Sequence, residues 1–381
     1  MGKNLSILIY SLASGGAERV VSILLEELKS KYNITLVLMN DTIFYDVPSD
    51  VNIKYIEKSN PTESGIKKLL KLPFLAFKYV RLCKENNTDI SLSFMNRPNY
   101  INTISKILGN KSKVIISERI APSQEYKTDG LKDKISRKLI SYLYPKADKI
   151  VPNAIGIMND LVEKFHINSS SITVVNNPID ISKVISKQND KVDFRDENFS
   201  FITIGRIQYQ KNHKLLIDTM RNIEAKLYII GDGELRDVLE NQIKELKLEN
   251  KVILLGREEN PYKYISKADC FVFSSLYEGF PNVLLEALAC DLPVISSDCQ
   301  SGPREILAPS SDVDFQLKED IELVKYGILT AVNNKNSLEK AMKLMINDDT
   351  LRDAYAQKAK LRAREFDKDK IISKWIEVIN R

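Results

Sequence analysis

The stretch from residue 270 to residue 286 constrains the fold more than any other part of this chain. An apolar run, Cys270–Ser274, is followed by a loop containing Gly279 and Pro281 and then by a helix start, so that Leu276–Glu286 reads LYEGFPNVLLE. Doubly wound α/β proteins bind ligands at the carboxyl ends of buried parallel strands, where such loops lie. The stretch therefore predicts an α/β fold with a ligand site at this loop.

The loop carries groups suited to a sugar phosphate. Pro281 fits the first helical turn, and the N–H groups of the next three residues point out of the helix, where its dipole favours phosphate. Glu286 lies about one turn further along and can meet a sugar hydroxyl, whereas Glu278 can face the reacting sugar. Two glutamates eight residues apart are often only a solvated loop and helix, so the pattern alone leaves both interpretations open.

Strand-like runs alternate with helical ones twice along the 381 residues, which predicts two doubly wound, Rossmann-like domains. Residues 181–200 lose periodicity and gain charge, so we place the linker there. The first domain spans 1–185, the second spans 196–365, and a helix at 366–381 packs back on the first. We expect the ligand in a cleft between the two sheets. The expected strands are Leu5–Tyr10, Asn33–Met39, Ile53–Ile56, Ile90–Phe94, Val114–Ser117, Lys149–Pro152, Ile172–Val175, Phe201–Ile204, Lys226–Ile230, Val252–Leu254, Cys270–Ser274 and Pro293–Ser297.

A pair of cations lies near the start of the second domain. The strand Phe201–Ile204 ends at Gly205-Arg206, and Lys211 follows five residues after the arginine. A planar guanidinium and a point charge suit a diphosphate, and they would stabilise the charge that develops as a diphosphate leaves a sugar. A metal ion is then unnecessary. Exposed cations are common, so in isolation this pair is more often surface charge.

Glycine turns at the other strand ends are weaker signals. Gly15-Gly16 lets a helix N-terminus approach an anion or an acceptor closely. Residues 231–236 (GDGELR) lack the third glycine of a dinucleotide fingerprint, so a tight turn is the better interpretation. Gly256-Arg257 can offer backbone groups to a base, on positional grounds only. Residues 301–305 (SGPRE) either close over the ligand or form only a turn with a cap.

The cysteines and histidines argue against a zinc or disulfide site. Four cysteines without C-x-x-C spacing, together with only two histidines, predict reduced thiols in a cytosolic protein. We expect Cys270 and Cys290 to be buried. The D-x-D pairs at 312/314 and 367/369 follow no strand, so we interpret them as solvated charge rather than metal ligands.

The first half of the chain is basic. Residues 1–185 hold 26 Lys and Arg against 18 Asp and Glu, a net +8, so the remainder carries 30 against 33, a net −3. Residues 66–84 contain six basic residues and no acidic one, and a second basic tract spans 127–149. Both tracts can rest on an anionic membrane surface or simply be solvated helix faces. Pro73 divides residues 66–84, and no run reaches the roughly 18 to 20 apolar residues that cross a bilayer. The residues expected at the membrane are Lys67, Lys68, Lys71, Lys78 and Arg81.

Together these motifs resemble glycosyltransferase family 4, whose members are retaining enzymes of the two-domain GT-B architecture. The resemblance rests on SGGAERV, GRIQYQKN, GDGELR, YEGFPNVLLEALACDLPVISSD and SGPREI, with the E-x7-E spacing of Glu278 and Glu286. It implies that Arg206 and Lys211 hold the donor diphosphate, that Glu286 binds the ribose and that Glu278 faces the transferred sugar, with no metal cofactor. The residues expected at the donor, from position and resemblance together, are Gly15, Gly16, Gly205, Arg206, Lys211, Arg257, Glu278, Gly279, Phe280, Pro281, Asn282, Val283, Leu284 and Glu286.

Stretches outside those motifs, including KLPFLAFKYVRLCK and NPYKYISKA, are similar to bacterial N-acetylgalactosaminyltransferases of N-linked protein glycosylation. This similarity implies transfer of N-acetylgalactosamine from UDP to a disaccharide on undecaprenyl diphosphate. The reaction would take place at the cytoplasmic membrane face, without a nucleic-acid partner. Many family members carry a histidine where residues 116–120 read ISERI, so Glu118 becomes the candidate that assists the acceptor hydroxyl. Asp291 stands where many carry glycine, a change that we expect the turn to tolerate.

Three other functions remain open from the sequence. The chain could transfer another UDP-sugar to a lipid-linked or capsular glycan, or it could be a UDP-sugar epimerase of the same architecture. It could also be a non-catalytic glycan- or lipid-binding module. The scarcity of histidine argues against an epimerase, and the intact set of two cations and two glutamates argues against loss of catalysis. Measuring UDP release with and without a lipid-linked glycan separates these classes.

Overall fold

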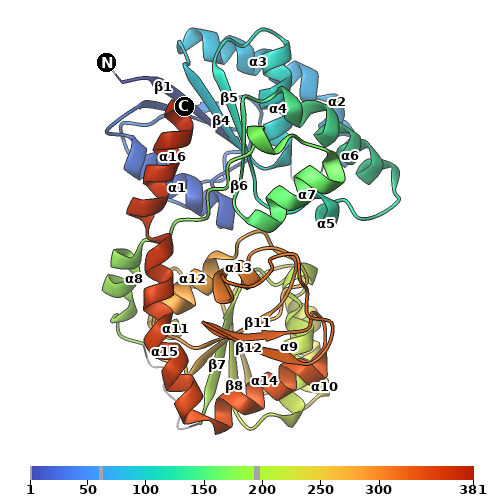
Figure 1. The fold of residues 1–381 in the computed structure, drawn as a ribbon, viewed down its shortest axis with the longest axis vertical. Helices are drawn as coiled ribbons and strands as arrows, with labels where there is room; N and C mark the ends of the chain where they lie inside the picture. Colours follow the sequence, from blue (N-terminus) through green and yellow to red (C-terminus); the bar gives the residue numbers. More distant parts are fainter. Residues whose placement is uncertain (1, 60–62, 193–197) are drawn as a thin grey trace. The chain divides into compact units, whose positions relative to one another are not determined.

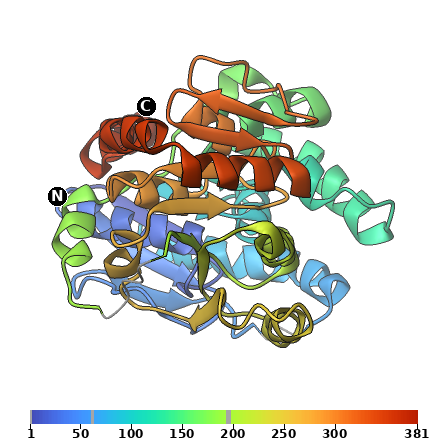
Figure 2. The same ribbon diagram turned by 90° about the horizontal axis from the view of Figure 1, so that it is seen from below.

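The computed structural model describes residues 2–59, 63–192 and 198–381. The chain forms two compact units (Figure 1). The first comprises Met1–Pro178 and Asp369–Arg381, and the second comprises Ile179–Lys368. Each unit is a mainly parallel sheet with helices on both faces (Figures 1 and 2), which confirms the predicted pair of doubly wound α/β domains.

The first unit contains a wholly parallel six-stranded sheet in the order β3-β2-β1-β4-β5-β6. The chain runs outward from β1 in one direction and from β4 in the other. A topological switch point therefore lies between the carboxyl ends of these two strands. The strands are β1 (Asn4–Ile9), β2 (Asn33–Leu38), β3 (Asn52–Tyr55), β4 (Ile90–Phe94), β5 (Lys113–Glu118) and β6 (Lys149–Pro152).

Helices cover this sheet, and the last of them comes from the end of the chain. In Figure 1 helix α16, in red, lies beside α1 and β1. Its Trp375 is fully buried in the same core as the β1 side chains, with its ring 5.7 Å from that of Phe94. The helices of this unit are α1 (Gly16–Leu28), α2 (Gly65–Leu70), α3 (Leu72–Glu85), α4 (Asn96–Ile107), α5 (Pro122–Glu125), α6 (Leu131–Leu143), α7 (Ile155–Phe165) and α16 (Lys368–Asn380).

The second unit contains a seven-stranded sheet in the order β12-β13-β11-β10-β7-β8-β9. All pairs are parallel except β12 with β13. The strands are β7 (Ser200–Ile204), β8 (Lys226–Ile230), β9 (Val252–Gly256), β10 (Cys270–Phe273), β11 (Val294–Ser297), β12 (Ile321–Val324) and β13 (Gly327–Thr330). The helices are α8 (Ile181–Gln188), α9 (His213–Thr219), α10 (Arg236–Glu245), α11 (Tyr262–Ile265), α12 (Asn282–Ala289), α13 (Pro303–Leu307), α14 (Lys335–Asn347) and α15 (Asp349–Ala363).

The structure corrects three expectations about the elements. Residues 172–175 form a single bridge to β6 rather than a strand. The hairpin β12–β13 was missed because β12 is half exposed and antiparallel, which gives it no continuous apolar run. The predicted linker begins instead with α8, which Asp180 caps by accepting the Lys183 N–H at 2.9 Å and which buries Ile181.

Candidate active site

The switch point of the second sheet lies between β7 and β10, which are hydrogen-bonded neighbours. The chain leaves β7 toward β8 and β9, and it leaves β10 toward β11 and β13. The loops that follow β7 and β10 therefore meet at one edge of the sheet. The first loop holds Arg206 and Lys211, and the second holds Glu278, so the fold brings together residues that are 67 positions apart in sequence.

Lys211 and Glu278 form an ion pair at this edge. The Lys211 Nζ lies 2.6 Å from Glu278 Oε1, and the two side chains are only 16% and 10% exposed. The same ammonium lies 5.3 Å from the centroid of the Phe273 ring. An ion pair this well shielded from water interacts more strongly than a surface pair. One face of the site thus holds a fixed cation and a fixed carboxylate.

Hydrogen bonds tie the two loops together behind this pair. The Ser274 hydroxyl donates to the Lys211 carbonyl at 2.8 Å. The Leu276 N–H donates to the Gln210 carbonyl at 2.8 Å, and the Gln210 amide donates to the Tyr277 carbonyl at 2.7 Å. Because main-chain carbonyls of both loops accept these three bonds, the positions of Lys211 and Glu278 are set by the backbone and not only by their own attraction.

Two glycines allow the neighbouring turns to approach these loops. A Cβ on Gly231, whose φ is +142°, would lie 2.0 Å from the Gly205 carbonyl oxygen. A Cβ on Gly302, whose φ is +83°, would lie 2.4 Å from the Gly279 carbonyl oxygen. Ser301 adds a hydrogen bond of 2.9 Å to the Glu278 carbonyl. The glycine at 231 therefore serves a close backbone approach, and residues 301–302 pack on the Glu278 loop.

Helix α12 carries the second glutamate. Glu286 is buried, 2% exposed, one turn inside the helix. Pro281 is the residue before the helix rather than its first residue, and the Leu284 N–H donates to the Pro281 carbonyl at 3.2 Å. The Leu284 N–H, one of the three N–H groups expected at a phosphate, is therefore already bonded within the turn. After the helix, Asp291 adopts a left-handed φ of +59°, which explains why glycine also suits this position.

The remaining donor-site candidates of this unit occupy the same edge. Arg206 follows Gly205 on the β7 loop, and Arg257 follows β9; both side chains are exposed. Phe280 is buried, with its ring 5.2 Å from that of Phe366. His213, which the sequence did not assign to the site, is buried beside the Lys211 loop. Burial and the Lys211 charge lower the pKa of His213 to about 3, so it adds no positive charge there.

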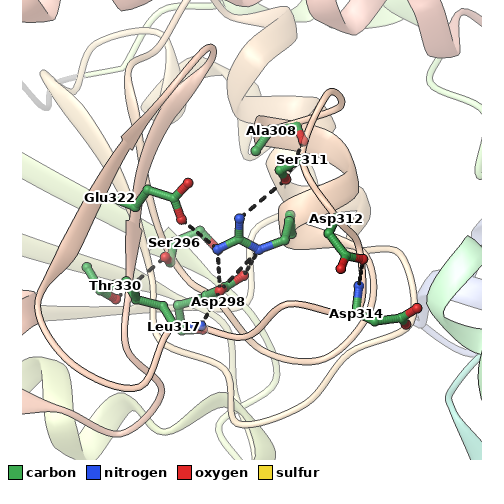
Figure 3. A network of polar contacts seen from close by, with 11 residues as sticks. Ser296, Asp298, Ala308, Ser311, Asp312, Asp314, Leu317, Glu322 and Thr330 are labelled. Atoms are coloured by element: carbon green, nitrogen blue, oxygen red, sulfur yellow. Dashed lines mark hydrogen bonds and ion pairs between the residues drawn. The ribbon is translucent and has the colours of Figure 1, made fainter.

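Arg304 of the SGPRE stretch lies at the centre of a polar network in the second unit. Its guanidinium donates to both carboxylate oxygens of Asp298, at 3.0 and 2.6 Å, and to Glu322 at 2.7 Å. Figure 3 shows Asp298, Glu322 and Ser311 converging on one point around this group. The Asp314 N–H bonds to Asp312 in the same view, and both acids are exposed, as predicted for solvated charge.

The first unit holds Glu118 at the carboxyl end of β5, in the wall of a cavity of about 420 Å³. Glu118 is 1% exposed and accepts hydrogen bonds from the Tyr144 hydroxyl and the Arg119 N–H. Burial, and then the charge of Glu125, raise the pKa of Glu118 to about 8. At neutral pH this carboxyl group is therefore mostly protonated, so it can donate a hydrogen bond but is poorly suited to accept a proton.

The other predicted residues of the first unit have partners of their own. Gly15 precedes α1, and the Glu18 carboxylate folds back so far that a Cβ on Gly15 would lie 2.2 Å from its Oε2. An anion approaching Gly15 and Gly16 would therefore meet a negative charge. Among the basic residues, Lys71 pairs with Glu63 at 2.6 Å. Two more of the cations predicted at the membrane have contacts within the unit. Arg81 pairs with Glu85, and the Lys78 Nζ lies 5.0 Å from the centroid of the Phe74 ring.

Within residues 2–59, 63–192 and 198–381, no three His, Cys, Asp or Glu side chains gather as metal ligands would. No helix of those same residues combines the length and apolar character required to cross a bilayer. The four cysteines are free thiols, and Cys270 and Cys290 are buried, as the sequence predicted; Cys83 and Cys299 are buried as well.

Comparisons with known proteins identify the family of this chain. The family model "Glycosyl transferases group 1" matches residues 184–362. A Campylobacter jejuni protein is 43% identical over 371 residues, 97% of each chain; it is named as a 4-α-N-acetylgalactosaminyltransferase acting on N-acetylgalactosamine-N,N'-diacetylbacillosaminyl-diphospho-undecaprenol. A second protein of that organism, named as an α-1,4-N-acetyl-D-galactosaminyltransferase, is 28% identical over 389 residues, 98% of each chain.

A solved structure shares the fold. Anabaena HepE in complex with UDP and glucose superposes with a TM-score of 0.78 over 99% of each chain, at 18% identity. The two doubly wound sheets are thus those of the GT-B fold. With a relative 43% identical along nearly its whole length and a matching family model, the chain belongs to the group 1 glycosyl transferases.

Proposed function

We propose that this protein transfers N-acetylgalactosamine from UDP to a disaccharide on undecaprenyl diphosphate, with retention of configuration. The observation that carries the proposal is the shielded Lys211–Glu278 pair at the switch point of the second sheet, in a chain 43% identical to a transferase named for this sugar and acceptor. That relative forms an α linkage, and UDP-N-acetylgalactosamine is itself α-linked, so an α product requires retention.

The donor diphosphate would bind to the two cations of the β7 loop. Lys211 is held at one position by Glu278 and by the backbone bonds behind it, whereas Arg206 is exposed on the same loop and can close on a phosphate from outside. Charge-assisted bonds to phosphate are the strong contacts of such a site. Glu286, one turn inside α12, would accept from the ribose hydroxyls, and Glu278 would orient the transferred sugar.

The chemistry then needs stabilisation of the leaving diphosphate. As the bond to the anomeric carbon breaks, negative charge grows on the phosphate oxygen, and Lys211 and Arg206 stabilise that charge. The acceptor hydroxyl attacks from the face that UDP leaves, and its proton passes to the departing phosphate oxygen. We propose that the cations act without a metal ion. Glu118, mostly protonated at neutral pH, would orient the acceptor by donating a hydrogen bond.

The lipid on the proposed acceptor places the reaction at a membrane. We propose a peripheral location on the cytoplasmic face, where nucleotide sugars are available.

Mass spectrometry of a synthetic undecaprenyl-diphosphate disaccharide tests the proposal. The acceptor is incubated separately with each of several UDP-sugars, because N-acetylgalactosamine and N-acetylglucosamine have the same mass. We expect one N-acetylhexosamine to be added, fastest from UDP-N-acetylgalactosamine, and UDP release to require the acceptor. Faster transfer from another donor would reject the sugar assignment. Conversion of the UDP-sugar without an acceptor would indicate an epimerase.

A further inference from the structure

Helices α2 and α3 expose a stripe of large apolar side chains. Ile66, Leu70, Phe74 and Phe77 are between 60% and 77% exposed. Their spacing of four, four and three residues places them on one side of a helix. Single exposed apolar residues are ordinary, but a contiguous row of four marks an interaction surface.

The stripe lies opposite the face that anchors α3 to the first unit. Leu72, Leu75 and Tyr79 are buried, so the core-facing side is already filled with apolar residues. Hydrogen bonds from the Lys71 N–H to the Lys67 carbonyl and from the Leu75 N–H to the Lys71 carbonyl continue across the break near Pro73. The two helices therefore present one common outer face, and its apolar residues are additional to those of the core.

A neighbouring helix extends this face. Leu131, the first residue of α6, is 69% exposed. The methylene groups of the adjacent Lys132 pack against Gly65 of α2, with a Cβ at Gly65 lying 3.4 Å from Lys132 Cε. We call the surface formed by Ile66, Leu70, Phe74, Phe77 and Leu131 the apolar ridge.

Charge around the ridge selects the class of partner. Lys67 and Lys84 are exposed beside it, and the Lys78 ammonium lies over the Phe74 ring at 5.0 Å. The ion pairs of Lys71 with Glu57 and Glu63 offset its charge, so the five predicted cations do not all attract an anion. Exposed aromatic and leucine side chains with a basic border fit the boundary between anionic headgroups and acyl chains.

We propose that the apolar ridge inserts into the surface of an anionic lipid bilayer, with Lys67 and Lys84 on the headgroups. The inference deepens the proposed function, since a lipid-linked acceptor must be met at a membrane. Gly65, Lys68, Leu69 and Lys132, all beside the ridge, also line the cavity that reaches Glu118. The disaccharide of a lipid-linked acceptor, carried on its diphosphate at the bilayer surface, would therefore lie next to the opening of that cavity.

Vesicle co-sedimentation of the full-length protein tests insertion. The triple variant Leu70→Ser/Phe74→Ser/Phe77→Ser should bind phosphatidylglycerol-containing vesicles at least tenfold more weakly than the wild type. The matched control, Leu323→Ser/Leu361→Ser, removes two similarly exposed residues of the second unit and should bind as the wild type does. UDP affinity should be unchanged in both, which separates this test from that of the transfer reaction. Equal vesicle binding by the triple variant and the wild type would overturn the proposal.

A single introduced tryptophan reports whether the ridge enters the lipid. The only native tryptophan, Trp375, is fully buried, so a change in the emission of Phe74→Trp on adding vesicles reports on residue 74. We expect a blue shift and quenching by brominated acyl chains when anionic vesicles are added, and neither change for the control Leu361→Trp. If the emission of Phe74→Trp did not change when vesicles were added, the proposal that the ridge inserts into lipid would be wrong. A concentration-dependent shift without vesicles would show self-association through the ridge and would overturn it too.

A charge variant separates the contribution of the basic border. Lys67→Gln/Lys84→Gln should lower vesicle affinity about fivefold for each charge at low salt, since one cation near such a surface contributes about 1 kcal/mol. The loss should shrink as salt screens the surface. If this variant bound anionic vesicles as tightly as the wild type does, and bound neutral vesicles equally well, the two lysines would not set a preference for anionic lipid.

Discussion

At the scale of single residues, Lys211 offers the most direct test of the proposed donor site. Lys211→Ala removes the proposed phosphate contact and leaves the Glu278 carboxylate without the cation that lies 2.6 Å away. We expect kcat/KM for transfer to fall about 100-fold or more, as for loss of a group that stabilises transition-state charge. Steady-state UDP release with the lipid-linked acceptor measures this. Lys214→Ala, which removes an exposed lysine of α9, is the control and should stay near wild type. Similar losses in the two variants would count against the assignment.

Glu118 should make the stability of the first unit depend on pH. Its pKa is raised from 4.5 to about 8 by burial and by Glu125. Between pH 4.5 and pH 8 the Glu118 carboxyl is ionised in the unfolded chain but keeps its proton in the folded one. The free energy of unfolding therefore falls as pH rises. The total fall is at most about 5 kcal/mol and is complete above pH 8.

Urea unfolding at several pH values, followed by the fluorescence of buried Trp375, measures this dependence. In Glu118→Gln the decline between pH 4.5 and 8 should become much shallower, because the amide does not ionise. Glu163→Gln removes an exposed acid of α7 and should keep the wild-type slope. An unchanged slope in the Glu118 variant would show that its proton is not retained on folding.

At the scale of elements, Arg304 links the β12–β13 hairpin to the rest of its sheet through two ion pairs, a buried one with Asp298 and a partly exposed one with Glu322. Arg304 joins Asp298, which follows β11, to Glu322 of β12, and both Arg304 and Asp298 are nearly inaccessible to water. Arg304→Ala leaves Asp298 buried without its cation, so we expect a loss of about 3 to 5 kcal/mol in the free energy of unfolding. Calorimetry or urea unfolding of the second unit measures it.

A conservative variant checks the cause of that loss. Arg304→Lys keeps the charge but cannot bond both oxygens of Asp298 and Glu322 at once, so it should lose less than the alanine variant. Lys340→Ala serves as a comparison, since that lysine of α14 pairs with Asp320 while both side chains are more than half exposed, and its loss should cost little. If Arg304→Ala unfolded no more easily than Lys340→Ala, the hairpin would not depend on the ion pairs of Arg304.

At the scale of the whole molecule, the two units should respond differently to the donor. UDP is proposed to bind the second unit, whereas Trp375 lies in the core of the first. At about 100 times its Kd, UDP should stabilise the second unit by about 2.7 kcal/mol. Heat-induced unfolding with UDP should therefore shift the calorimetric transition of the second unit while the Trp375 fluorescence transition stays in place. Equal shifts would show that the units unfold together.

Most of the fold could be predicted because most of its strands are buried on both faces. Runs such as residues 226–230 and 270–274 are almost wholly apolar, and their alternation with helices predicts parallel sheets. Some elements that are partly exposed to solvent were not predicted, because they lack a continuous apolar run. The half-exposed β12 has no apolar run, and α8 is a short helix whose charged face resembles a linker.

The sequence by itself determined the chemistry available: two cations, two glutamates and the glycines that let loops approach one another. Only the tertiary structure decided which of them meet, because strand order, and not sequence distance, places the β7 and β10 loops at one edge of a sheet. The tertiary structure also places Lys71 in ion pairs and leaves the side chains of the apolar ridge exposed. By burying Glu118 it raises the pKa of that carboxyl group. These outcomes depend on burial and neighbours, which the chain acquires only when distant segments pack together.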